Sequence, residues 1–358
     1  MRAVPVAPGE RITALDAVRG VAVLGILTMN AVSYGLSPAA YWNLDAGGSD
    51  TWLDWLIGGT GEVLFDQKFM GLFSLLFGAG VVLFAERAEA KGRRAGWFSL
   101  WRNILLLFIG LAHMALWDGD ILVVYAVCAP LVILLRRRKP ATLLVAGSLI
   151  VLSSAAGAAL VQSNVEDPIG ELGGGLWFDA GSMSDAAGGW FLYDVLARGL
   201  GMMLIGVALY RLGVLTGRRD RDFYRRMVAT GLLFGLPLAA LGLALVAAAG
   251  FSGDLALVGS VPNTVATIPI VLGYVSAVTL WDAASDSPLR RRVRAAGQMA
   301  LTNYLTQTVI GIVVLRGLFD RGQLSRSGIA VFVLAVWALQ LWWSQAWLAR
   351  FRYGPAEW

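Results

Sequence analysis

The chain has 358 residues, of which 57% are hydrophobic and only 15% are charged. A soluble domain carries about 25% charged residues, so this composition excludes a soluble globule. Apolar runs long enough to cross roughly 30 Å of hydrocarbon recur along the chain, and the short alternating segments of a membrane β-barrel are absent. The net charge of +5 does not indicate a nucleic-acid partner, because the basic residues cluster between apolar runs. We expect a polytopic helical membrane protein whose partners include membrane lipid.

Hydropathy and the spacing of glycine, proline and charge predict one all-α integral membrane domain over residues 1–358, with about ten spans. The expected spans are 12–34, 63–86, 98–117, 119–136, 141–163, 190–215, 224–249, 257–282, 296–319 and 327–349. The first span is too long and too charged to be a cleavable signal peptide. The single cysteine, Cys128, excludes an intramolecular disulfide.

Basic residues occupy every second connection between the expected spans. They form groups within 87–94, 136–140, 218–226, 290–294 and 350–352. The intervening connections are expected to be acidic or nearly uncharged. Because cytoplasmic loops carry the excess of Lys and Arg, this pattern predicts that both termini are cytoplasmic.

Two connections on the opposite side are longer than usual. Residues 35–62 combine aromatic side chains with glycines and acids, and residues 164–189 are rich in glycine and acids. Each could anchor at the membrane interface, or it could form a lid over an acceptor site. The sequence leaves both interpretations open.

The first span carries a polar stripe. At about 100° per residue, Asp16, Arg19, Asn30 and Tyr34 fall on one face of a helix, and Asp16 can pair with Arg19 three residues later. A helix that faces lipid would not carry such a stripe, so this one should face the bundle interior or a tunnel. The alternative is an ion pair that fixes helix orientation, together with interhelix hydrogen bonds.

Two further spans contain polar residues that could bind a substrate. Lys68 lies near one end of the second span, where its ammonium group could instead extend outward to the interface. Asn303 and Gln307 lie one turn apart on the ninth span and could line a cavity or bond to neighbouring helices. We name all three as candidate substrate-binding residues, with Asn30 and Tyr34.

The only histidine, His113, lies about one turn from Asp118 and Asp120, where the third span turns into the fourth. A histidine beside two carboxylates can act as a base whose tautomer is set by one of them, or as part of a proton relay. A structural histidine with satisfied hydrogen bonds is the alternative. One histidine without a nearby cysteine pair gives little support to a metal site, so no metal is expected.

Five ordered stretches together resemble the bacterial YeiB-like membrane family, which is defined by a domain of unknown function. They are Leu15-Asp16-Ala17-Val18-Arg19-Gly20 through Asn30, Phe73-Ser74-Leu75-Leu76-Phe77-Gly78-Ala79-Gly80, Gly110-Leu111-Ala112-His113 with Trp117-Asp118-Gly119-Asp120, Ala300-Leu301-Thr302-Asn303-Tyr304-Leu305, and Tyr353-Gly354-Pro355-Ala356-Glu357-Trp358. The resemblance covers nearly the whole chain. It implies a multi-pass protein of the bacterial cytoplasmic (inner) membrane.

The opening Leu-Asp-x-x-Arg-Gly element is also similar to that of the transmembrane acyltransferase superfamily, which includes the heparan-glucosaminide acetyltransferases and the bacterial membrane O-acyltransferases. This resemblance implies an enzyme that takes an acyl group from cytoplasmic acyl-CoA and places it on an acceptor across the membrane. It assigns no catalytic role to His113, whose role is inferred from its neighbours alone.

The leading hypothesis is therefore an acyl-CoA-dependent transmembrane acyltransferase. Arginines including Arg19 and Arg102, with Asp16, would hold the acyl-CoA, and His113 would deprotonate a hydroxyl or amine of a small-molecule or glycan acceptor. One alternative is a proton-coupled transporter or flippase, in which His113, Asp118, Asp120 and Lys68 form a relay. Another is a non-catalytic membrane scaffold. The sequence leaves the acceptor and a homo-oligomeric state open.

Overall fold

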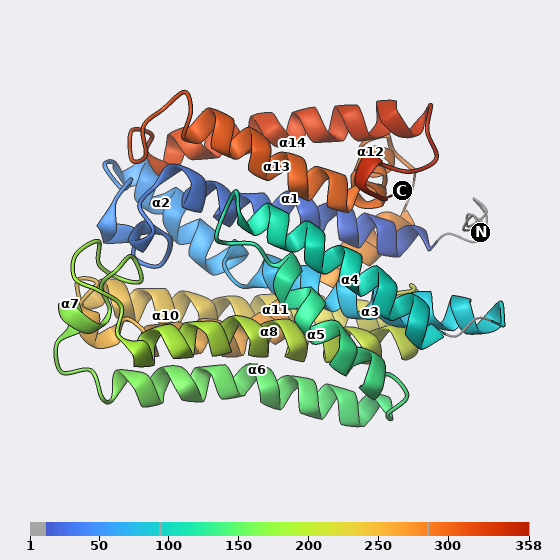
Figure 1. Ribbon diagram of the computed structural model, residues 1–358, viewed down its shortest axis with the longest axis horizontal. Helices are drawn as coiled ribbons and strands as arrows, with labels where there is room; N and C mark the ends of the chain where they lie inside the picture. The colour runs from blue at the N-terminus through green and yellow to red at the C-terminus, as the bar shows by residue number, and fades with distance from the viewer. Residues whose placement is uncertain (1–11, 93–94, 285, 358) are drawn as a thin grey trace.

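The computed structural model describes residues 12–92, 95–284 and 286–357, and over these ranges the protein is all-α. Within them the only β-type pairing is one isolated bridge between Leu172 and Met183, so no strand forms. The long helices run along the longest axis of the molecule as one bundle (Figure 1). The predicted fold class is confirmed.

The helices are α1 (Thr13–Gly35), α2 (Trp52–Thr60), α3 (Lys68–Ala90), α4 (Ala95–Met114), α5 (Leu122–Leu135), α6 (Pro140–Gln162), α7 (Pro168–Glu171), α8 (Asp185–Arg211), α9 (Arg221–Thr230), α10 (Leu236–Ala248), α11 (Val261–Ala284), α12 (Pro288–Gln298), α13 (Ala300–Leu315) and α14 (Arg326–Leu348). There are also two π-helical turns: Gly61–Phe65 follows α2, and Gly231–Gly235 precedes α10.

Eight helices in the described ranges are long and apolar enough to cross a membrane. A ninth is reached if α12 and α13 count as one span, although they meet at an angle of 85°. The expected fourth span corresponds to α5, which has only 14 residues and reaches about 21 Å at 1.5 Å per residue. A multi-pass helical protein is therefore established, whereas the count of ten spans is not.

The part of 35–62 from Trp52 onward differs from the expected interfacial segment. Thr51 and Asp54 form a capping box that starts α2, and an apolar helical stretch then continues to Ala90. Asn43 reaches the second long connection, because its Nδ2 donates to the carbonyl of Trp177 at 3.2 Å. The two long connections therefore pack against each other.

Charge differs between the two ends of the bundle (Figure 1). We call one end the basic end: α1 begins there and the described chain finishes there. Arg87 lies in the last turn of α3 at this end, and the loop after α5 carries the 136–139 run. The opposite end, the acidic end, carries the 35–62 and 164–189 connections. This arrangement agrees with the alternation of basic loops in the sequence.

One loop at the acidic end breaks the expected pattern. The connection between α13 and α14 carries Arg316 and Arg321, and α14 begins with Arg326, so the prediction of acidic or nearly uncharged loops is wrong there. Arg316 donates to the carbonyls of Ser33 and Tyr34 at the end of α1, both at 3.1 Å. Such arginines satisfy helix-end carbonyls, so their charge has a structural use.

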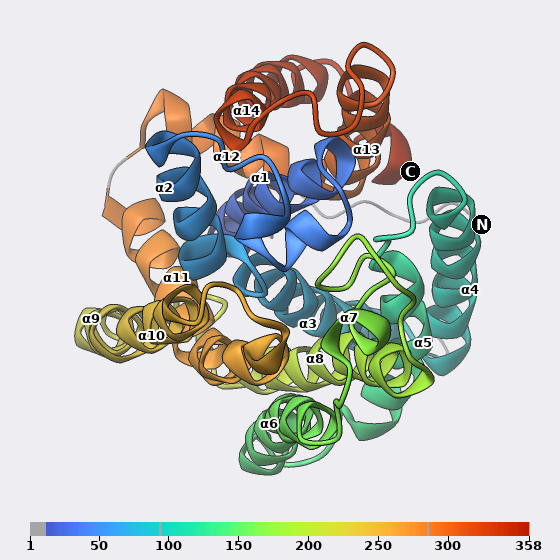
Figure 2. The same cartoon turned by 90° about the vertical axis from the view of Figure 1, so that its left-hand side faces the viewer.

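In the view along the bundle from the acidic end, α1 lies inside a ring of other helices (Figure 2). Its most apolar window is 78% buried, as the polar stripe predicted. The corresponding windows of α6 and of the α9–α10 stretch are only 28% buried, so most of their residues lie outside the core of the bundle. The core of the protein therefore forms around α1, α3 and α8.

Glycines allow the central helices to approach closely. A Cβ on Gly78 of α3 would collide with the carbonyl of Met203, and a Cβ on Gly206 of α8 would collide with the carbonyl of Leu75. The collision partners are backbone atoms, so they could not move aside without separating the helices. Small residues at such crossings give the backbone contact on which membrane helices depend for packing.

Candidate active site

His113 and Asp120 face each other across the turn between α4 and α5. The Nδ1 atom of His113 lies 2.7 Å from Oδ1 of Asp120, and both side chains are buried. The other carboxylate oxygen of Asp120 accepts from the amide of Val123 at 2.9 Å, which fixes the carboxylate at the start of α5. Because a carboxylate only accepts, the proton of the neutral imidazole lies on Nδ1, and Nε2 carries a free lone pair.

The Nε2 atom of His113 is buried and has no hydrogen-bond partner among the residues that the structure describes. One ring nitrogen of His113 is therefore held by Asp120 and the other is available to a ligand, while the choice between a catalytic and a structural histidine stays a prediction. Asp118, by contrast, is exposed, so Asp120 alone of the two predicted carboxylates orients the imidazole. A buried acceptor with no partner costs free energy, and such atoms are common where a substrate binds.

Tyr304 of α13 completes this cluster, and the sequence interpretation did not select it. Its hydroxyl donates to Oδ1 of Asp120 at 3.4 Å, and its ring centroid lies 5.1 Å from that of His113. The signal was present in the Leu301–Leu305 motif, but nothing in the sequence says which of its polar residues reaches α5. We call His113, Asp120 and Tyr304 the histidine cluster.

A cavity of about 580 Å³ runs from the histidine cluster towards the basic end. Tyr304 forms part of its wall, together with residues of α1, α3, α4, α5 and α12. On α3 the lining extends from Phe73 to Arg87, which is about 21 Å at 1.5 Å per residue. We call it the arginine-lined cavity.

Within the described part of the chain, three arginines line the cavity: Arg19, Arg87 and Arg102. Arg19 pairs with Asp16 at 3.3 Å, as the spacing predicted, while Asp16 itself stays outside the lining. Arg102 lies over the ring of Phe84, 5.0 Å from its centroid. Guanidinium groups at the entrance of a cavity are suited to bind phosphate groups.

Two polar atoms in the cavity wall lack hydrogen-bond partners among the described residues. They are the hydroxyl oxygen of Ser99 and the side-chain carbonyl of Asn103, which are one turn apart on α4. The amide nitrogen of Asn103 is already used, because it donates to the carbonyl of Ala126 at 2.6 Å. The residues that carry this unpaired hydroxyl and carbonyl line the cavity, and the two groups match a ligand that carries amides.

The C-terminal segment closes one side of the same cavity. The carboxylate of Glu357 accepts from the amides of Leu301 and Thr302 at 2.8 and 3.1 Å, and from the hydroxyl of Thr302 at 2.6 Å. It therefore caps the N-terminus of α13, where the helix dipole stabilises a negative charge.

The predicted residues Asn30 and Tyr34 are buried in the bundle but do not line this cavity. The hydroxyl of Tyr34 bonds to that of Thr308 at 2.8 Å, and its ring packs against Trp117 with centroids 4.9 Å apart. The stripe on α1 therefore reaches the cavity only at Arg19. A substrate role for Asn30 and Tyr34 stays a prediction.

Asn303 and Gln307 lie on α13 next to the cluster but bond to neighbouring helices. Asn303 binds Ser344 of α14 at 3.0 Å, and Gln307 donates to Gln340 at 2.8 Å and to the carbonyl of Val23 at 2.9 Å. Both side chains are fully buried and outside the cavity lining. Interhelix bonding, one of the two interpretations of these residues, is what the structure contains.

Lys68 does not extend outward to the interface, because it is fully buried. Its ammonium group donates to the carbonyl of Glu62 at 2.7 Å and to the side chain of Asn263. Lys68 belongs to a separate charged cluster at the acidic end, and no contact joins it to His113.

Comparison with known proteins agrees with the motifs of the sequence. Residues 209–358 match the family described as "Protein of unknown function (DUF418)". The chain is 33% identical over 383 residues to the uncharacterized protein YeiB of Escherichia coli (strain K12), and the match covers 98% of this chain and 95% of that protein. It is 36% identical over 136 residues to the uncharacterized protein YxaH of Bacillus subtilis (strain 168), covering 36% and 34% of the two chains. The chain therefore belongs to the YeiB-like family, whose function is unknown.

Proposed function

We propose that the protein is a transmembrane acyltransferase that moves an acyl group from acyl-CoA to a hydroxyl or amine acceptor. The observation that carries this proposal is the arginine-lined cavity of about 580 Å³, which ends at the histidine cluster. It offers cations at one end and, at the other, Tyr304, whose ring lies against the imidazole of His113. Acyl-CoA has the matching order of groups, with phosphates at one end and the thioester at the other.

The cavity residues would bind the donor in order along its length. Arg19, Arg87 and Arg102 contact the phosphates, since guanidinium groups bind phosphate oxygens through charge-assisted hydrogen bonds. The pantetheine arm carries two amides, which can donate to the carbonyl of Asn103 and accept from the hydroxyl of Ser99. Satisfying two buried unpaired atoms favours the bound state over the empty cavity.

The reaction follows from the tautomer of His113. The acceptor oxygen or nitrogen attacks the thioester carbonyl carbon while Nε2 takes its proton, and Asp120 stabilises the imidazolium that forms. The carbon–sulfur bond then breaks, and the thiolate of coenzyme A leaves with the proton that His113 returns. Tyr304 holds Asp120 in position through its hydroxyl.

The orientation is part of the same proposal. The positive-inside rule places the basic end in the cytoplasm, where acyl-CoA is found, and the acidic end on the outer side of the bacterial inner membrane. The donor then enters between the cytoplasmic arginines, and the acceptor reaches the histidine cluster from the other side. A proton relay through Lys68 has less support, because Lys68 bonds to Glu62 and Asn263 and not to the histidine cluster.

The test is acyl transfer by the purified protein in proteoliposomes, with radiolabelled acetyl-CoA and a cell-envelope extract as the source of acceptors. We expect label in the extract with the native protein and a loss of transfer of at least 100-fold with His113→Gln. His113 lies outside the cavity lining, so this variant should bind acetyl-CoA as the native protein does. Undiminished transfer by a folded His113→Gln protein would falsify the proposed role of His113.

A further inference from the structure

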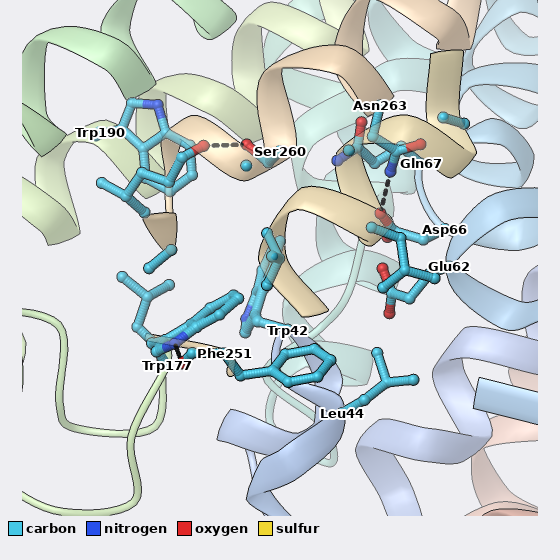
Figure 3. A pocket seen from close by; sticks show the side chains of 18 residues that line it. Trp42, Leu44, Glu62, Asp66, Gln67, Trp177, Trp190, Phe251, Ser260 and Asn263 are labelled. Carbon is cyan, nitrogen blue, oxygen red and sulfur yellow. Dashed lines mark hydrogen bonds between the residues drawn. The ribbon is translucent and has the colours of Figure 1, made fainter. Parts of the chain in front are cut away.

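A second, smaller cavity lies at the acidic end and has a different chemistry (Figure 3). Its volume is about 60 Å³, which corresponds to roughly four to six water-sized groups. Both long connections contribute to it, through Trp42 of the first and Trp177 of the second. We call it the tryptophan-lined cavity.

Among the residues that the structure describes, two charged side chains line this cavity, and both are acids. Glu62 and Asp66 belong to the π-helical turn and the residue after it, and their carboxylates lie on the same side of the cavity in Figure 3. Asp66 accepts from Nδ2 of Asn263 at 2.9 Å, while the Glu62 carboxylate makes no hydrogen bond or ion pair within the described residues. Single π-helical turns are often found at functional sites, and the next residue, Gln67, has φ of 62°, which is uncommon outside glycine.

The neighbouring cations are directed to other partners. Arg198 bonds to Asp194 at 2.7 Å and to Thr264 at 2.9 Å, and Lys68 bonds as described above. Neither of these two cations lines the cavity.

Charged groups of both signs surround this cavity. The bases Lys68, Arg198 and Arg326 are buried and have their own hydrogen-bond partners, whereas the half-buried Glu62 carboxylate has none within the described residues. A cation bound beside Glu62 would give its carboxylate a partner.

Four aromatic residues, Trp42, Trp177, Trp190 and Phe251, share the rest of the lining with aliphatic and uncharged polar residues. The indole N–H of Trp177 donates to the carbonyl of Phe251 at 2.9 Å, and that of Trp190 donates to the carbonyl of Ser154 at 3.2 Å. Both N–H groups are thus satisfied by backbone, so these rings offer the cavity carbon surface and no donor. The negative face of an aromatic ring attracts cations, and tryptophan does so most strongly.

We propose that the tryptophan-lined cavity binds a small organic cation, an ammonium or methylated ammonium group. An aromatic wall and two carboxylates without a cationic group in the lining are complementary to that chemistry. A metal ion fits less well, because the described residues contain no group of three or more His, Cys, Asp or Glu side chains placed to hold one. The group could come from a free amine or from the headgroup of a lipid. The proposal does not depend on acyl transfer.

The experiment follows tryptophan fluorescence of the purified protein in nanodiscs during titration with choline and with its neutral isostere, 3,3-dimethylbutan-1-ol. We expect saturable binding of choline at least tenfold tighter than binding of the isostere. Glu62→Gln should weaken choline binding at least tenfold, whereas Glu62→Asp should keep the preference for the cation. Glu166→Gln, which changes an exposed acid at the same end, should bind as the native protein does.

Equal binding of the two ligands, or a folded Glu62→Gln protein that binds choline normally, would overturn the proposal. So would the absence of saturable binding of choline. The same choline titration in nanodiscs of phosphatidylethanolamine and in nanodiscs of phosphatidylglycerol shows whether the natural ammonium group belongs to a lipid or to a soluble amine. Weaker apparent choline binding in phosphatidylethanolamine indicates competition by the lipid headgroup, and equal binding in both lipids indicates a soluble amine.

Discussion

Asp120→Asn is the change that tests the histidine cluster most closely. The native carboxylate uses one oxygen for His113 at 2.7 Å and the other for the amide of Val123 at 2.9 Å. An asparagine has only one oxygen, and we expect that oxygen to stay with the amide of Val123, whose partner in the native protein is the Asp120 carboxylate. The side-chain NH₂ then faces Nδ1 of His113, so the imidazole proton moves to Nε2 and the base is lost.

The magnitude follows from the chemistry that is removed. A positioned general base contributes about 10²- to 10⁴-fold, or about 2.7–5.5 kcal/mol of the barrier. We expect acyl transfer in proteoliposomes to fall by that factor. Acetyl-CoA binding should change less than about twofold, because Asp120 is outside the lining of the arginine-lined cavity.

The matched control is Asp118→Asn, which removes an exposed carboxylate two residues earlier in the same turn. It should transfer acyl groups at the native rate. The reasoning is refuted if folded Asp120→Asn protein keeps more than a tenth of native transfer, or if Asp118→Asn loses as much as Asp120→Asn.

Three further changes test other parts of the structure. Ser99→Ala should raise the KM for acetyl-CoA about fivefold with little effect on kcat, because one hydrogen bond worth about 1 kcal/mol is lost. Steady-state kinetics measure the change, and an unchanged KM contradicts the assignment. Gly206→Leu should destabilise the protein by about 1–3 kcal/mol, because the new side chain collides with the carbonyl of Leu75. Denaturant unfolding in detergent measures the change in stability, and the control is Gly80→Leu, where a Cβ meets no neighbour within 4 Å. Arg326→Gln should lower the free energy of unfolding by about 1–3 kcal/mol, because it removes the 2.7 Å hydrogen bond from Arg326 to the carbonyl of Ala40. It should also speed proteolysis within 35–62, and cleavage at the native rate would contradict this.

The sequence predicted those features that depend on neighbours along the chain. Hydropathy identified the helical class, the stripe on α1 predicted its burial, and the spacing predicted the Asp16–Arg19 pair. The contact of His113 with an acid seven residues later could also be expected, although the choice of Asp120 over Asp118 depends on how the turn folds.

Features that depend on distant segments could not be predicted. Tyr304 joins the histidine cluster from 184 residues away, and only the packing of α13 on α5 brings it there. Asn303, its immediate neighbour, points to α14 instead. One interpretation of Lys68 had its ammonium group at the interface, because a lone lysine in a span prefers water, but the partners that allow its burial come from α11 and from the π-helical turn.

The proposed function depends above all on whether the arginine-lined cavity binds acyl-CoA. Equilibrium binding of acetyl-CoA to the purified protein measures this without knowledge of the acceptor. We predict saturable binding of about one molecule per chain, weakened at least tenfold in an Arg19→Gln, Arg102→Gln double variant and unchanged in Arg291→Gln, an exposed arginine outside the cavity lining. No saturable binding, or equal binding by all three proteins, would contradict the account.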